Sequence, residues 1–106
     1  MTLHLTLESV EPLPRGKPLR IEIRDTSLAD APAELVQRVD RTVQKANTSI
    51  PLALTVERLP PGSTLWVHVD VDGDGRVSEG DFITMESYPL DAQAEEVTII
   101  RLRRVT

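Results

Sequence analysis

The chain contains no cysteine, few aromatic residues and no long apolar run, and each absence excludes a class of protein. Without cysteine there can be no disulfide, no cysteine nucleophile and no thiolate metal site. Aromatic residues make up 3% of the sequence, too few to build stacking platforms for single-stranded nucleic acid. The net charge of −5 also opposes binding to a phosphate backbone. We therefore expect no nucleic-acid partner.

No apolar segment approaches the roughly 20 residues that a membrane-spanning helix needs, so no transmembrane segment is expected. The segment Met1–Leu7 alternates between polar and apolar residues instead of forming the continuous apolar run of a signal peptide. The sequence as it stands therefore predicts no export signal. With 106 residues and a hydrophobic fraction of 40%, the chain is expected to form a single domain, residues 1–106, around one core.

The most distinctive segment is the acidic stretch Asp70–Asp81, which reads D-V-D-G-D-G-R-V-S-E-G-D. Aspartates at loop positions 1, 3 and 5, a glycine at 6, an apolar residue at 8 and an acid at 12 follow the spacing of a calcium-binding loop. Carboxylates this close together repel one another, and a hard divalent cation relieves that repulsion. The alternative is an Asp-Gly turn without a metal, because these are also the commonest turn residues. We favour calcium.

The predicted calcium ligands are the side chains of Asp70, Asp72 and Asp74, the backbone carbonyl of Arg76, the hydroxyl of Ser78 and the side chain of Asp81. Aspartate at position 12 replaces the bidentate glutamate of an EF-hand, which predicts weak affinity, nearer extracellular than cytosolic calcium levels. The loop resembles the dockerin-type calcium loop, which also carries aspartate at position 12. Val77 is expected to face inward and anchor the loop. His68 is expected to lie on the surface, because calcium prefers oxygen ligands.

Apolar and polar residues alternate along most of the remaining chain, as expected of half-buried strands. The apolar faces comprise Leu3, Leu5 and Leu7; Leu19, Ile21 and Ile23; Ile50, Leu52, Leu54 and Val56; Leu65, Val67, Val69 and Val71; and residues within Glu96–Val105. The segment Phe82–Tyr88 also reads as a strand. Proline- and glycine-rich turns separate these segments. We predict an all-β fold, a single antiparallel β-sandwich of seven to eight strands with a strand–calcium loop–strand unit. Trp66 lies on the polar side of its strand, either as part of a binding surface or covered by a loop.

One segment fits two structures. Between Ala33 and Lys45, apolar residues recur at helical spacing, at Leu35, Val36, Val39 and Val43. Asp30 would cap such a helix and Pro32 would lie in its first turn. Read as a strand, the same segment is interrupted by polar residues. The residues taken alone favour the helix.

A longer pattern bears on this choice. The segment Leu19–Ala33 holds a strand ending in Asp25-Thr-Ser27, followed by Asp30-Ala-Pro32. A proline-centred strand at Ile50–Leu54 and a Pro-Gly turn come later in the chain. This order of elements resembles the YbaY/YscW-type proteins, bacterial lipoproteins and type III secretion pilotin-like chaperones with a small β-sandwich fold. The resemblance implies that Ala33–Val43 is a strand. It also implies an extracytoplasmic protein, in the periplasm or at the cell surface, that chaperones or escorts a partner.

The expected function is therefore that of a non-enzymatic calcium-binding protein that binds another protein at the cell envelope. The alternative is a structural or adhesive module that calcium stiffens and that chaperones nothing. An enzyme is disfavoured because the sequence suggests no Ser/His/Asp set and no glycine-rich phosphate loop. The enzyme class considered is a hydrolase that uses the acidic loop. The sequence fixes neither the partner nor the oligomeric state.

Overall fold

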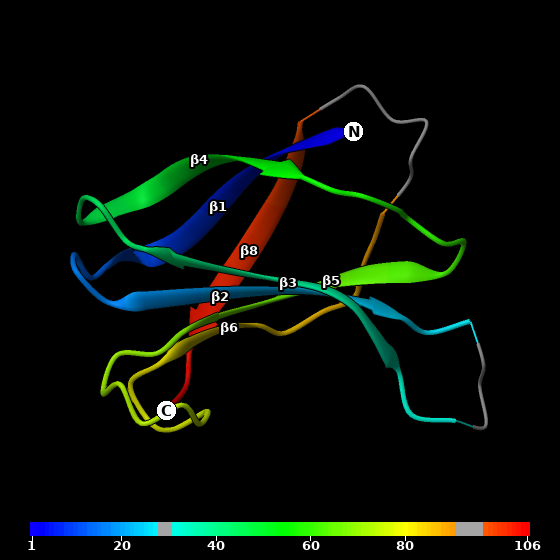
Figure 1. Cartoon of the computed structure of the whole chain (residues 1–106). Coiled ribbons are helices and arrows are strands. Elements are labelled where there is room, and N and C mark those ends of the chain that lie inside the picture. Colours follow the sequence, from blue (N-terminus) through cyan, green and yellow to red (C-terminus); the bar gives the residue numbers. More distant parts are fainter. Residues whose placement is uncertain (28–30, 91–96) are drawn as a thin grey trace.

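The computed structural model describes residues 1–27, 31–90 and 97–106, and these form β-strands and no helix (Figure 1). The strands are β1 (Thr2–Leu13), β2 (Pro18–Asp25), β3 (Glu34–Thr42), β4 (Asn47–Thr55), β5 (Ser63–Val69), β6 (Phe82–Thr84), β7 (Tyr88–Pro89) and β8 (Thr98–Arg104). The described part of the chain accordingly holds no helix that could cross a membrane. The all-β prediction is confirmed.

The strands form where the sequence alternates, because every second side chain can then be removed from water on one face. Leu5 and Leu7 on β1 and Ile21 and Ile23 on β2 are almost fully buried, while the residues between them are more exposed. The core they join comprises Leu3, Leu5, Leu7, Leu13, Leu19, Ile21, Ile23, Val43, Leu54, Val56, Leu65, Val67, Val69, Phe82, Ile100 and Leu102. The apolar faces read from the sequence thus supply most of this core.

The strands form one curled, mixed sheet in the order β3-β2-β5-β6-β8-β1-β4, with β7 paired to β5. Strand β8 joins its two halves, since Thr98–Arg101 pairs with β1 and Leu102–Arg104 pairs with β6. Figure 1 shows β8 running diagonally between the half that contains β1 and β4 and the half that contains β2, β3 and β5. The predicted antiparallel sandwich is wrong in this respect. Strands β1 and β8 run parallel, and the sheet curls into a half-barrel, because β8 enters between two strands distant in sequence.

The segment with two interpretations is strand β3, which pairs antiparallel with β2. The implied strand is therefore confirmed and the helix is wrong; the Asp30 cap lies outside the described residues. A register shift explains the misleading spacing. Gln37 pairs with Ile23 and Leu35 pairs with Arg24, so Val36 is an extra residue in the ladder. Val36 and Val39 consequently both pack against the core although they are three residues apart, a spacing that resembles a helix face.

The predicted strand over Phe82–Tyr88 is divided into β6 and β7, and side-chain hydroxyls replace ladder hydrogen bonds near the break. The backbone N–H of Val67 donates to Oγ1 of Thr84 at 3.3 Å. The backbone N–H of Arg101, at the point where β8 leaves β6, donates to the hydroxyl of Tyr88 at 2.9 Å. The sheet therefore opens here without leaving these donors unpaired.

Two neighbouring isoleucines on β8 test whether this strand holds the halves together. Ile100 is fully buried, whereas Ile99 is 48% exposed. We expect Ile100→Ala to lower the free energy of unfolding by about 2–5 kcal/mol, because it leaves a cavity in the core. Ile99→Ala should change it by less than about 0.5 kcal/mol. Urea denaturation measures both, and equal effects would contradict the assignment of β8 to the core.

Candidate metal centre

The acidic loop joins the ends of β5 and β6, so the predicted strand–loop–strand arrangement is present. His68 and Val69 pair with Ile83 and Phe82, which brings the two ends of the loop together. Asp70 and Asp81 stand at these ends and are both buried. The short ladder therefore fixes the base of the loop and places two carboxylates opposite one another.

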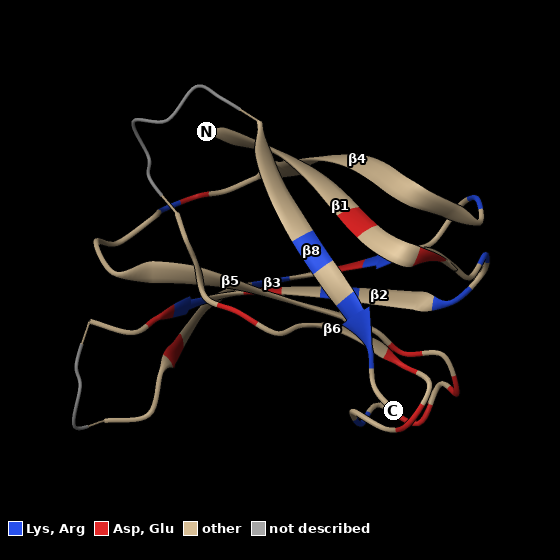
Figure 2. Cartoon of the chain, turned by 180° about the vertical axis from the view of Figure 1, so that it is seen from behind, with Lys and Arg blue, Asp and Glu red and all other residues tan. Residues whose placement is uncertain are grey.

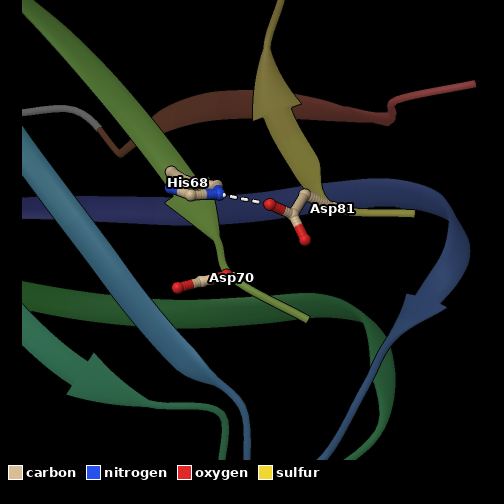
Figure 3. Close-up of side chains that lie close together, drawn as sticks. All are labelled: His68, Asp70 and Asp81. Carbon is tan, nitrogen blue, oxygen red and sulfur yellow. Dashed lines mark hydrogen bonds and ion pairs between the residues drawn. The ribbon is translucent and has the colours of Figure 1, made fainter. Parts of the chain in front are cut away.

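Asp81 organises the loop from its base. Its Oδ1 accepts the backbone N–H of Val71 at 2.9 Å, and its Oδ2 accepts the backbone N–H of Ser78 at 3.1 Å. Oδ2 also lies 2.7 Å from Nε2 of His68 (Figure 3), and the two side chains are 0% and 1% exposed. Burial alone would raise the pKa of Asp81, but the hydrogen bonds from His68, Val71 and Ser78 outweigh it and hold the pKa below its usual value. An ionised carboxylate only accepts hydrogen bonds, so Nε2 of His68 is the donor.

Asp70 shapes the first half of the loop. Its Oδ1 accepts the N–H of Gly73 at 3.1 Å and its Oδ2 accepts the N–H of Gly75 at 2.7 Å. Both glycines have positive φ, 72° and 76°, a conformation that residues with a side chain rarely adopt. Glycine at these two places therefore lets the loop wrap around the Asp70 carboxylate without backbone strain.

The four aspartates predicted as ligands come together. Asp70, Asp72, Asp74 and Asp81 each offer a carboxylate oxygen, and these oxygens lie within 4.8 Å of one another. Calcium binds oxygen at about 2.3–2.6 Å, so oxygens up to about 5 Å apart can ligate one ion. An oxygen that accepts a single hydrogen bond, such as Oδ1 of Asp81, still has a second lone pair for a cation. The donor set and its spacing fit a hard divalent ion.

The other two predicted ligands have different positions. The hydroxyl of Ser78 donates to Oδ2 of Asp72 at 2.7 Å, which holds the pKa of Asp72 below its usual value and brings Ser78 to the cluster. For Arg76 the structure shows the backbone N–H, which donates to Oδ1 of Asp74 at 2.9 Å. No contact identifies the Arg76 carbonyl as a ligand.

Two expectations about the loop are wrong. Val77 is 47% exposed and does not anchor the loop, because Asp70 and Asp81 hold it by polar contacts. His68 is buried, and with Asp70 and Asp81 it forms a second group of ligand atoms within 4.8 Å. The signal was present in the sequence, since His68 and Asp70 are two residues apart on a strand and therefore share a face. Calcium prefers oxygen ligands, so the carboxylate set is the better candidate for a hard cation.

The loop is also tied to the rest of the molecule through the backbone. Asp70 N–H donates to the carbonyl of Pro18 at 2.9 Å, at the start of β2. Gly80 N–H donates to the carbonyl of Val105 at 2.8 Å, and Val105 N–H donates to the carbonyl of Asp81 at 2.7 Å. An ordering of the loop would therefore reach β2 and the chain that follows β8.

The single tryptophan reports on this region. The ring of Trp66 lies 5.5 Å from that of His68, and the guanidinium of Arg24 stacks over it at 4.7 Å. Trp66 is half-buried. Its proximity to His68 makes its fluorescence a probe of the loop.

Removing the charge of Asp81 tests its structural role. We expect Asp81→Asn in EDTA to lower the free energy of unfolding by about 3 kcal/mol, because an amide cannot accept all the hydrogen bonds now made to two oxygens. The matched control is Asp74→Asn, an exposed position in the same loop, expected to change it by less than about 0.5 kcal/mol. Similar losses in the two variants would contradict a special role for Asp81.

The pKa of Asp81 gives a prediction for pH. A carboxyl whose pKa is lowered by folding adds stability in full above its unfolded pKa of about 3.9, and that stability disappears as pH falls through the folded value. In EDTA, the stability difference between the wild type and Asp81→Asn should thus shrink as pH falls below about pH 4. Urea midpoints at a series of pH values measure it. A difference that persists at the lowest pH would show that the charge of Asp81 is not what stabilises the loop.

Comparison with known proteins gives one structural relative. No family model matches the chain, and no curated protein matches it. A solved structure, that of an alternative pilotin from the type II secretion system of Vibrio cholerae, matches with a TM-score of 0.70 and 22% identity, over 100% of this chain and 97% of that chain. These comparisons support neither membership of the YbaY/YscW-type family nor a dockerin-type loop. At this identity the likeness shows the fold alone: the chain has a pilotin-like fold.

Proposed function

We propose that this protein is a non-enzymatic, calcium-binding envelope protein that binds and escorts another protein. The observation that supports the partner-binding part is the likeness of the whole fold to a secretion pilotin. The resemblance read from the sequence, to pilotin-like chaperones, points in the same direction. Together they favour a periplasmic or cell-surface location and a protein partner.

Calcium is the cation we propose for the acidic loop. Asp70, Asp72, Asp74 and Asp81 would hold it, and the spacing of their oxygens supports this choice. Two of these carboxylates are buried at the ends of β5 and β6, so an ion would link the two strands. What the ion supplies is charge neutralisation within a cluster of negative groups, and thereby rigidity.

The absence of catalysis is also part of this proposal. The buried His68–Asp81 pair resembles the base and orienting acid of a hydrolase. The described residues place no serine hydroxyl within hydrogen-bond distance of His68. The hydroxyl of Ser78 lies 2.7 Å from Oδ2 of Asp72 and 3.5 Å from Oδ2 of Asp81, so it contacts the acid of the pair and not the histidine. The pair is better explained as the support of the loop.

The second candidate is a structural or adhesive module that calcium stiffens and that escorts nothing. The hydrogen bonds between the loop, Pro18 and Val105 favour it, because they would spread the stabilising effect of an ion through the sheet. Affinity capture from the native envelope separates the two candidates. A stoichiometric protein partner supports the escort function, whereas its repeated absence favours the structural module.

Titration with calcium tests the metal site. At a calcium concentration ten times the dissociation constant, linkage predicts about 1.4 kcal/mol of added stability. For a chain of this size that corresponds to a rise in Tm of about 5–10 °C. We expect this rise at millimolar calcium, together with a change in Trp66 fluorescence.

Two variants with the same change of charge provide the control. Asp72→Asn removes a proposed ligand, and Glu79→Gln removes a carboxylate of the same loop that is outside the cluster. The first should weaken the response to calcium, because an amide oxygen at this loop position ligates without a charge, and the second should retain it. Equal responses, or no response of the wild type at millimolar calcium, would rule out the proposed site.

A further inference from the structure

The two edge strands of the sheet face one another across a gap. Strands β3 and β4 stand at opposite ends of the strand order, yet residues 43–46 connect them directly. Figure 1 shows them diverging from this turn. Away from the turn, the side chain of Gln37 bridges the gap: its Nε2 donates to the carbonyl of Thr55 at 2.8 Å, and its Oε1 accepts the N–H of Glu57 at 3.4 Å. The gap is therefore bounded at both ends.

The core is incompletely covered in this gap. A cavity of about 280 Å³ opens at the turn end of the gap, and its lining includes Leu19 of β2, Thr42 at the end of β3, Val43 of the turn, and Ile50 and Leu52 of β4. Ile50 and Leu52, and Val39 on the facing strand, are only partly buried although they pack against the core. Apolar side chains from a further segment would complete the burial that the curled sheet leaves unfinished.

Strand β3 can accept such a segment through its backbone. In the described residues β3 pairs with β2 alone. The N–H and C=O groups of every second residue of β3 therefore face the gap and have no ladder partner. Strand β4 is less suitable because Pro51 lacks an N–H within it. An entering segment would therefore add to β3 and contact β4 through side chains.

The charges around the gap select the chemistry of the segment. Arg41 pairs in register with buried Leu19 and so lies on the core face of β3, at its edge. Hydrogen bonds from Gly16 N–H to the Val43 carbonyl (2.8 Å) and from Val43 N–H to the Lys17 carbonyl (3.0 Å) place two turns side by side. These turns add three further cations, Arg15, Lys17 and Lys45, to this end of the molecule, where Figure 2 shows Lys and Arg gathered.

Arg41 distinguishes an acidic segment from a purely apolar one. Within the part of the chain that the structure describes, none of these four cations forms an ion pair. A segment lacking acids would cover Arg41 and remove its water without supplying a counterion, which is costly. An inward-facing charge on an edge strand also discourages indiscriminate pairing. A carboxylate in the segment would satisfy both conditions.

We propose that the gap between β3 and β4 binds an extended segment of a partner protein, which adds a strand to β3, places apolar side chains over Val39, Ile50 and Leu52, and pairs a carboxylate with Arg41. This inference rests on the proposed partner-binding function and names the site and the chemistry of the partner. The mode of binding is strand addition at a free sheet edge.

A designed peptide tests the gap directly, whatever the identity of the partner. The probe is the blocked peptide Glu-Thr-Val-Thr-Val-Thr-Val-Thr-Glu, whose glutamates share a face with the valines. Titrated into the full ¹⁵N-labelled chain, it should shift the amide signals of β3 and β4 and slow amide exchange along β3. No binding at millimolar peptide, or shifts confined to other strands, would overturn the proposal.

Charge reversal makes the test specific. Arg41→Glu should weaken binding of the glutamate peptide by about tenfold and strengthen binding of the same peptide with lysine in place of glutamate. The control Arg103→Glu changes an exposed arginine on β8, whose register partner is on β6, and should leave both affinities unchanged. Thermal melts confirm that both variants fold. Equal affinities of the wild type and Arg41→Glu for the two peptides would contradict the role of Arg41.

Affinity capture from the envelope separates this proposal from the proposed function. A partner captured by the wild type and lost with Arg41→Glu supports both. A partner captured equally by both proteins overturns the assignment of the gap and leaves the escort function intact. Peptide binding that depends on Arg41, with no partner captured by the wild type, supports the gap as a strand-binding site and counts against the escort function.

Discussion

The carboxylate of Asp81 is the point on which the candidate metal centre depends. It is buried between β5 and β6 and receives hydrogen bonds from His68, Val71 and Ser78. These three donors belong to the strand before the loop, the start of the loop and its later part. One side chain thus links the strand before the loop to both the first and the later part of the loop. The other aspartates can cluster because this base is fixed, and their mutual repulsion is then left for a cation to relieve.

Much of the architecture was readable from the sequence because burial and strand period coincide. The alternating segments at Leu3–Leu7, Leu19–Ile23 and Leu65–Val69 form strands whose apolar residues are buried. The order in which distant strands pair leaves no such trace. The parallel pairing of β1 with β8 depends on tertiary structure, because β-propensity does not indicate which strands will be neighbours. Likewise the extra residue at Val36 disguised a strand as a helix, because a bulge changes the period of the buried face.

The sequence predicted the aspartates of the candidate site but not the contact between His68 and Asp81 that supports them. Spacing alone identified the aspartates, since loop ligation imposes a fixed pattern on consecutive residues. The partnership of His68 with Asp81 spans residues on two strands, and its detection needed their register. The electrostatics of the molecule are likewise visible only in three dimensions. The acidic loop begins beside Pro18, which follows Lys17 of the basic turns, and the N–H of Asp70 donates to the carbonyl of Pro18. The acidic loop and the basic turns are therefore neighbours. A change of charge at either one alters the field at the other.

The central place of β8 has a consequence for biosynthesis. This strand lies between β6 and β1, yet it is the last strand in the described sequence to leave the ribosome. Until it arrives, the inner borders of the two halves have no neighbour, and a nascent chain in that condition offers two templates for pairing with other chains. Folding must therefore wait for the end of translation of this segment, and the pairing of the first strand with the last makes it slow for a protein of this length.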